Sequence, residues 1–151
     1  MDTMKSLFII AESQIDARII HTLLNCERYE HVYQVPVSSF SNMSSVARTL
    51  RLKQGQCGKI DKIIVAFDAD TEKKDVVNDR VAIMRYLTNA DHDDSMEVFC
   101  FVPSIEVSLY PNGFPNKNGD VAALTDFMKK HLEELREVEI VKDMQSFIDE
   151  K

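Results

Sequence analysis

The chain of 151 residues is poor in glycine and cysteine. None of its four glycines directly follows a predicted strand, so the sequence lacks the glycine-rich phosphate loops of nucleotide-binding proteins. Cys26, Cys57 and Cys100 are widely spaced and form no Cys-x-x-Cys motif, which argues against disulfides and against a zinc site. We expect reduced thiols in a cytoplasmic protein.

Long hydrophobic runs are also missing, and basic residues are in deficit. No apolar run approaches the ~18 residues that a membrane-spanning helix needs, and the apolar stretch before Glu12 is too short for a signal peptide. The 18 basic and 25 acidic side chains give a net charge of −7 and a pI of about 5.1. This balance argues against non-specific binding to anionic membranes or nucleic acid. A nucleic acid substrate stays open only if a metal ion and a local basic strip hold it.

The apolar residues, 44% of the chain, fall into a pattern of four strands that alternate with helices. The predicted strands are Ser6–Glu12, His31–Val37, Ile60–Phe67 and Glu97–Val102. This order favours a three-layer α/β/α fold with a mostly parallel four-stranded sheet. We expect a single domain over 1–151, with its core at about 6–103 and C-terminal helices at about 104–151. The strand that contains Pro36 is expected at an edge, where it could pair with a second copy in a homodimer.

Helices are predicted where apolar residues recur every three to four positions. They span Ile15–Glu27, Ser45–Gln54, Glu72–Asn89 and Val121–Val138, with a further turn or two at Met144–Ile148 and a short helix ending near Tyr110. Ser38–Ser45 is rich in Ser and Asn, and Pro111–Asp120 is rich in Pro, Gly and Asn, so both segments are predicted to be loops.

Acidic residues stand at the ends of three predicted strands. Glu12 follows the first strand, Asp68 and Asp70 follow the third, and Glu106 lies just past the fourth. The carboxyl ends of parallel strands share one edge of a sheet, so we expect these side chains to converge. Converged carboxylates repel one another, and oxygen ligands of this kind suit Mg²⁺ or Mn²⁺. The alternative is that single acids cap the following helices, as Asp70 could.

Two segments resemble the motifs of the TOPRIM family of topoisomerases, primases and OLD-type nucleases. IIAESQID contains the strand-end glutamate and the later aspartate, as Glu12 and Asp16, and IIVAFDAD contains the Asp-x-Asp pair, as Asp68 and Asp70. The resemblance covers roughly Leu7–Val102. It implies that Glu12 is a general acid/base and that Asp68 and Asp70 hold Mg²⁺ (or Mn²⁺).

The resemblance extends to a supporting set of acids and shows two departures. Asp16 and Glu106 would be supporting or second-metal ligands, since the segment Pro103–Glu106 resembles an additional acidic segment of OLD-type nucleases. The glycine that usually follows the glutamate is Ser13, and TEKKD follows Asp70 in place of a small turn that contains glycine.

These features give a leading functional hypothesis and two alternatives. The first is a metal-dependent nuclease or nuclease-like protein that acts on phosphodiester bonds. Basic residues are then candidates for a phosphate-binding rim, namely Arg48, Arg51, Lys53, Lys59 and Lys62. The second is a catalytically inert TOPRIM-like module that binds a partner protein through Tyr110 and Phe114. The third is a receiver-like phosphoacceptor at Asp68, which requires a lysine after a fifth strand.

Overall fold

The computed structural model describes residues 6–52 and 61–150. Within these ranges, four parallel strands form one sheet in the order β2-β1-β3-β4. The strands are β1 (Ser6–Ala11), β2 (His31–Pro36), β3 (Lys62–Asp68) and β4 (Met96–Phe101). The expected four-stranded parallel sheet is therefore confirmed.

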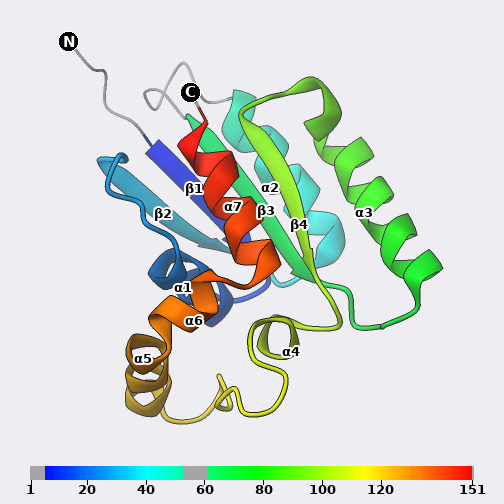
Figure 1. Cartoon of the computed structure of the whole chain (residues 1–151). Coiled ribbons are helices and arrows are strands. Elements are labelled where there is room, and N and C mark those ends of the chain that lie inside the picture. The colour runs from blue at the N-terminus through cyan, green and yellow to red at the C-terminus, as the bar shows by residue number, and fades with distance from the viewer. Residues whose placement is uncertain (1–5, 53–60, 151) are drawn as a thin grey trace.

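Helices cover both faces of the sheet, as Figure 1 shows, which gives three α/β/α layers. The helical elements are α1 (Gln14–Leu23), α2 (Phe40–Leu52), α3 (Lys74–Thr88), the 3₁₀ turn η1 (Ala90–His92), α4 (Ile105–Leu109), α5 (Val121–Lys130), α6 (Leu132–Arg136) and α7 (Glu139–Asp149). One apolar core joins the sheet to α1 and α4–α7, and a second joins its other face to α2 and α3.

Burial of the strands follows their apolar pattern. Every residue of β3 is buried, as expected for a continuous apolar run in the middle of a parallel sheet. In contrast, β2 contains no fully buried residue and forms one edge of the described sheet, as Pro36 predicted. Pairing of this edge with a second copy stays a prediction.

The order of the strands creates a topological switch point between β1 and β3. The chain leaves β1 through α1 on one face of the sheet, and it later passes from β2 to β3 and β4 through α2 and α3 on the other. The carboxyl ends of β1 and β3 therefore border the place where successive connections diverge. Ligands of open α/β sheets usually bind in this crevice.

Three predicted helix boundaries were wrong. The second helix begins at Phe40 rather than Ser45, because Met43 and Ala47 provide a buried face that the Ser- and Asn-rich composition concealed. The predicted helix Val121–Val138 is two helices, α5 and α6, which are separated at His131. The last helix is longer than expected and runs through Glu139–Asp149.

The thiols and the helices also bear on the expected environment of the chain. Cys26 and Cys100 are free, and burial raises the pKa of each thiol to about 11, so both are poor nucleophiles. Cys57 lies outside the described residues.

None of the helices in residues 6–52 and 61–150 combines the length and apolar character needed to span a bilayer. A cytoplasmic location stays a prediction.

Candidate acidic site

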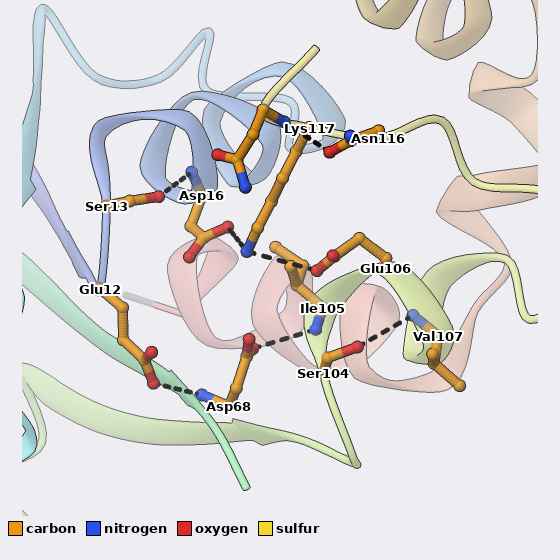
Figure 2. Close-up of polar contacts among 11 residues, drawn as sticks. Glu12, Ser13, Asp16, Asp68, Ser104, Ile105, Glu106, Val107, Asn116 and Lys117 are labelled. Atoms are coloured by element: carbon orange, nitrogen blue, oxygen red, sulfur yellow. Dashed lines mark hydrogen bonds and ion pairs between the residues drawn. The ribbon is translucent and has the colours of Figure 1, made fainter. Parts of the chain in front are cut away.

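Glu12 and Asp68 meet at the carboxyl ends of the adjacent strands β1 and β3. The Oε1 atom of Glu12 accepts a hydrogen bond from the backbone N–H of Asp68 at 2.7 Å (Figure 2). Asp68 Oδ1 in turn accepts a hydrogen bond from the backbone N–H of Ile105 at 2.9 Å. These bonds hold both carboxylates at the switch point and connect β3 to the start of α4.

Burial and neighbouring charges raise the pKa of both carboxyl groups. Burial raises the pKa of Asp68 to about 7, and the negative charge of Glu12 contributes to this shift. Burial also raises the pKa of Glu12, with further contributions from the charges of Asp70 and Asp16. Both shifts disfavour the ionised carboxylates, first because the groups are partly buried and second because other acids lie nearby.

Asp16 and Glu106 lie on either side of the ammonium group of Lys117 (Figure 2). The Lys117 Nζ atom lies 2.7 Å from Asp16 Oδ1 and 3.3 Å from Glu106 Oε1. Burial lowers the pKa of Lys117, but the hydrogen bond and charge of Asp16 and the charge of Glu106 raise it overall. Lys117 therefore remains protonated at neutral pH, and one cation of the chain is already part of the acidic edge.

Asp70 lies at the rim of the same edge. It is exposed, whereas Asp68 is buried, and its backbone N–H donates a hydrogen bond to Pro103 O at 2.8 Å. Its φ of 60° lies in the left-handed region, which Asp adopts more readily than most residues. The backbone at Asp70 therefore carries some strain at this corner of the sheet.

Helix capping does not account for Glu12 or Asp70. Ser13 caps α1, because its Oγ atom accepts a hydrogen bond from the Asp16 N–H at 3.1 Å. The backbone of Ser13 is extended, with φ −144°, so this position has no need of glycine. The N-cap of α3 is Lys73, which makes no side-chain cap hydrogen bond. Capping of α1 by Glu12 and of α3 by Asp70 is therefore excluded.

The predicted metal ligands fit a metal only in part. Within residues 6–52 and 61–150, no group of three or more Asp, Glu, His or Cys side chains has a metal-binding arrangement. Asp68, at the switch point beside Glu12, still fits Mg²⁺, which needs only one or two carboxylates and keeps several waters. Asp16 and Glu106 do not fit as free ligands, because Lys117 lies between them.

Lys117 is the site residue that sequence reasoning missed. It lies in the predicted loop Pro111–Asp120, and 101 positions separate it from Asp16. No periodicity or motif connects residues so far apart. The only available signal was the excess of acidic residues predicted at this edge. It indicates that a cation lies nearby, but it does not indicate which residue provides it.

The predicted basic rim is not at this edge. Lys62 begins β3 at the opposite end of the strand, is buried, and forms an ion pair with Glu150. Arg51 forms an ion pair with Asp93, which precedes β4. Lys53 and Lys59 lie outside the described residues. Lys62 and Arg51 therefore stabilise the amino edge of the sheet instead of lining the acidic site.

The aromatic residues proposed as a partner surface pack inside the chain. The rings of Tyr110 and Phe114 both contact Phe127 of α5 edge-on, with centroids 5.2 Å and 5.4 Å away. They anchor the loop that carries Lys117. The phosphoacceptor alternative required a lysine after a fifth strand, but the described ranges contain four strands, and Lys117 contacts Asp16 and Glu106 rather than Asp68.

The fold and the site together define an open, doubly wound α/β protein with an acidic carboxyl edge. Comparisons with protein-family models, with curated proteins and with solved structures find no match to this chain. The TOPRIM resemblance stays a prediction that rests on the segments around Glu12 and Asp68.

Proposed function

We propose that the chain binds Mg²⁺ or Mn²⁺ at the carboxyl ends of β1 and β3 and acts on phosphodiester bonds, as a nuclease or nuclease-like protein. The observation that carries this proposal is the pair of Glu12 and Asp68, two carboxylates that repel each other at the switch point of the sheet. A divalent cation removes that repulsion, and its open positions accept phosphate oxygens.

Each acid has a separate role in this proposal. Asp68 holds the cation, and Asp70 supports it from the rim. The raised pKa of Glu12 brings this carboxyl closer to neutral pH, where a general acid/base is most effective. The bound cation would neutralise charge on the phosphate and lower the pKa of a water molecule.

A nucleic acid would approach over the start of α3. Lys73 and Lys74 are exposed and follow the end of β3, so they lie on the acidic edge rather than the opposite one. They would give the phosphate backbone two cations, which stand between the exposed acids Glu72 and Asp75, in a chain whose net charge is −7.

The direct test is cleavage of single- and double-stranded DNA and RNA in millimolar Mg²⁺ or Mn²⁺. Glu12→Gln and Asp68→Asn should each reduce the rate by roughly 10²–10⁴-fold, the usual effect of losing a general acid/base or a metal ligand. Glu27→Gln changes an exposed acid away from the site and should leave the rate unchanged. Equal rates in the wild type and both site variants would exclude the proposed roles.

Binding of the metal can be tested without a substrate. Thermal unfolding with and without Mg²⁺, Mn²⁺ or Ca²⁺ should show a metal-dependent rise in the melting temperature of the wild type, since a ligand of the native state stabilises it. The Asp68→Asn/Asp70→Asn variant should lose this rise. An equal rise in both proteins would place the metal elsewhere.

A second candidate function is an inert module that binds a partner protein. One observation favours it: Ile83 and Tyr86 are 49% and 84% exposed and lie three positions apart on α3, so they share one side of that helix. If this surface binds a partner, Ile83→Ser/Tyr86→Ser should abolish capture of that partner, and Asp68→Asn should not. The opposite result would favour the acidic edge as the functional surface.

A further inference from the structure

The side chain of Lys117 is built into the acidic edge instead of extending into solvent. It is 16% exposed, and that of Asp16 is 7% exposed. The Oε1 atom of Glu106 is buried, and it faces the ammonium without an aligned hydrogen bond. The contact between Glu106 and Lys117 is therefore mainly electrostatic, whereas Asp16 provides both a hydrogen bond and charge.

The loop around Lys117 fixes the position of this ammonium. Tyr110 and Phe114 pack against Phe127 on the N-terminal side of the lysine. On its C-terminal side, the backbone N–H groups of Asn118 and Gly119 donate hydrogen bonds to Asn116, at 3.0 Å each. Lys117 thus projects from an anchored turn, and its place between the two carboxylates belongs to the fold.

An ammonium in this place is incompatible with a divalent cation at the same carboxylates. Ions of like charge a few ångströms apart repel strongly where water is largely excluded. A second metal ion could bind Asp16 and Glu106 only if Lys117 moved away, which would break its 2.7 Å bond to Asp16.

The geometry points to Lys117 as a resident cation that takes the place of a second metal ion between Asp16 and Glu106, so that the acidic edge accepts one divalent cation rather than two. Asp16 and Glu106 are then positioning residues that hold the lysine. This inference deepens the proposed function and rests on it for the single cation at Asp68. The statement about Lys117 itself can be tested separately.

The test is the number of Mn²⁺ ions bound per chain, measured by calorimetric titration and by the electron paramagnetic resonance signal of free Mn²⁺. The wild type should bind one ion. Lys117→Met keeps much of the side-chain length but removes the charge, and it should bind two. Lys117→Arg restores the cation and should return the number to one. Lys129→Met changes an exposed lysine of α5 and should also bind one.

Two more variants identify the ligands and guard against misfolding. Asp16→Asn in the Lys117→Met background should return the number from two to one. Glu106→Gln in the otherwise wild-type chain should leave it at one, because Glu106 holds the lysine and not a metal. If Lys117→Met fails to fold, as judged by circular dichroism, the numbers of ions bound by the wild type and by Glu106→Gln still test the inference. Two ions in the wild type and one in Glu106→Gln would overturn the inference.

The outcomes separate this inference from the proposed function. One ion in both the wild type and folded Lys117→Met would leave the metal site standing and overturn the role of Lys117. No ion in the wild type but one in Lys117→Met would refute the proposed function and support the lysine as a resident cation. No ion in either protein would refute both.

Discussion

At the amino ends of the strands, charged side chains lie in pairs of opposite sign, whereas at the carboxyl ends acidic side chains outnumber the basic ones. Arg51 pairs with Asp93, Lys62 with Glu150, and Arg85 with Asp91 and Glu97. The carboxyl edge holds five acids in one cluster, with Lys117 as the lysine that contacts them, namely Glu12, Asp16, Asp68, Asp70, Glu106 and Lys117. Lys73 and Lys74 lie exposed at the same edge, after β3.

The difference distinguishes charges that stabilise the fold from charges that weaken it. A charge that leaves water loses stabilisation by the solvent, and a partner of opposite sign restores much of it. A buried carboxylate beside another carboxylate has no such compensation. A site that weakens the fold in the absence of a ligand is expected where a ligand binds. The comparison therefore favours the carboxyl edge as the place where a ligand binds, independently of any motif.

The largest expected effect on the contrast between the two edges is that removing the charge of Asp68 stabilises the fold. At pH 8 and without metal, Asp68→Asn should raise the free energy of unfolding by on the order of 3 kcal/mol, since a pKa raised from 3.8 to about 7 disfavours the ionised form. The amide oxygen can still accept the Ile105 N–H. Denaturant unfolding measures the change, and Asp93→Asn, which breaks a pair with Arg51, should lower the stability instead. Destabilisation by both variants would remove the contrast.

The pH dependence of stability should follow from the same group. The folded pKa of Asp68 lies above its unfolded value, so folded Asp68 binds its proton more tightly. Its contribution to stability is therefore greatest below about pH 4 and is lost as the pH rises through about 7. Melting temperatures from pH 4 to pH 8 should fall more steeply for the wild type than for Asp68→Asn. Parallel curves would show that Asp68 titrates normally.

A smaller effect is expected on binding of nucleic acid. Lys73→Glu/Lys74→Glu should weaken binding of a labelled oligonucleotide by roughly tenfold at low salt, because two phosphate-facing charges are reversed. Fluorescence anisotropy provides the measurement. Arg48→Glu serves as the control and should have little effect. Arg48 is an exposed residue of α2, and the last turn of this helix carries Arg51 to the amino edge of the sheet. If Arg48→Glu lowered the binding free energy by half as much as the double variant, in proportion to its single charge reversal, binding would depend on total charge alone.

The smallest effect on stability should come from the ion pairs at the amino ends of the strands. Arg51→Met removes an ion pair whose side chains are 32% and 14% exposed, and it should lower the free energy of unfolding by about 0.5–1 kcal/mol. The difference between the two proteins should shrink in high salt, which screens such pairs. A salt-independent loss would attribute the effect to packing of the arginine stem.

Much of the fold and half of the site could be predicted from local patterns. Apolar runs such as Ile63–Phe67 indicate a buried strand by themselves, and strand ends in a parallel sheet share an edge, so Glu12 and Asp68 were expected together. The helix that begins at Phe40 was missed because composition outweighed periodicity. Lys117 could not be found, because its position depends on how a loop packs through Tyr110 and Phe114, which no local pattern encodes.

The bond between Lys117 and Asp16 also has a consequence for how the protein is made. The two residues are 101 positions apart, so at about 5–20 residues per second a ribosome adds the lysine roughly 5–20 s after the aspartate. During that interval, Asp16 lacks its counter-ion while β2, β3 and β4 are made. The nascent chain should therefore complete its acidic corner late, after all four strands of the described sheet have been made.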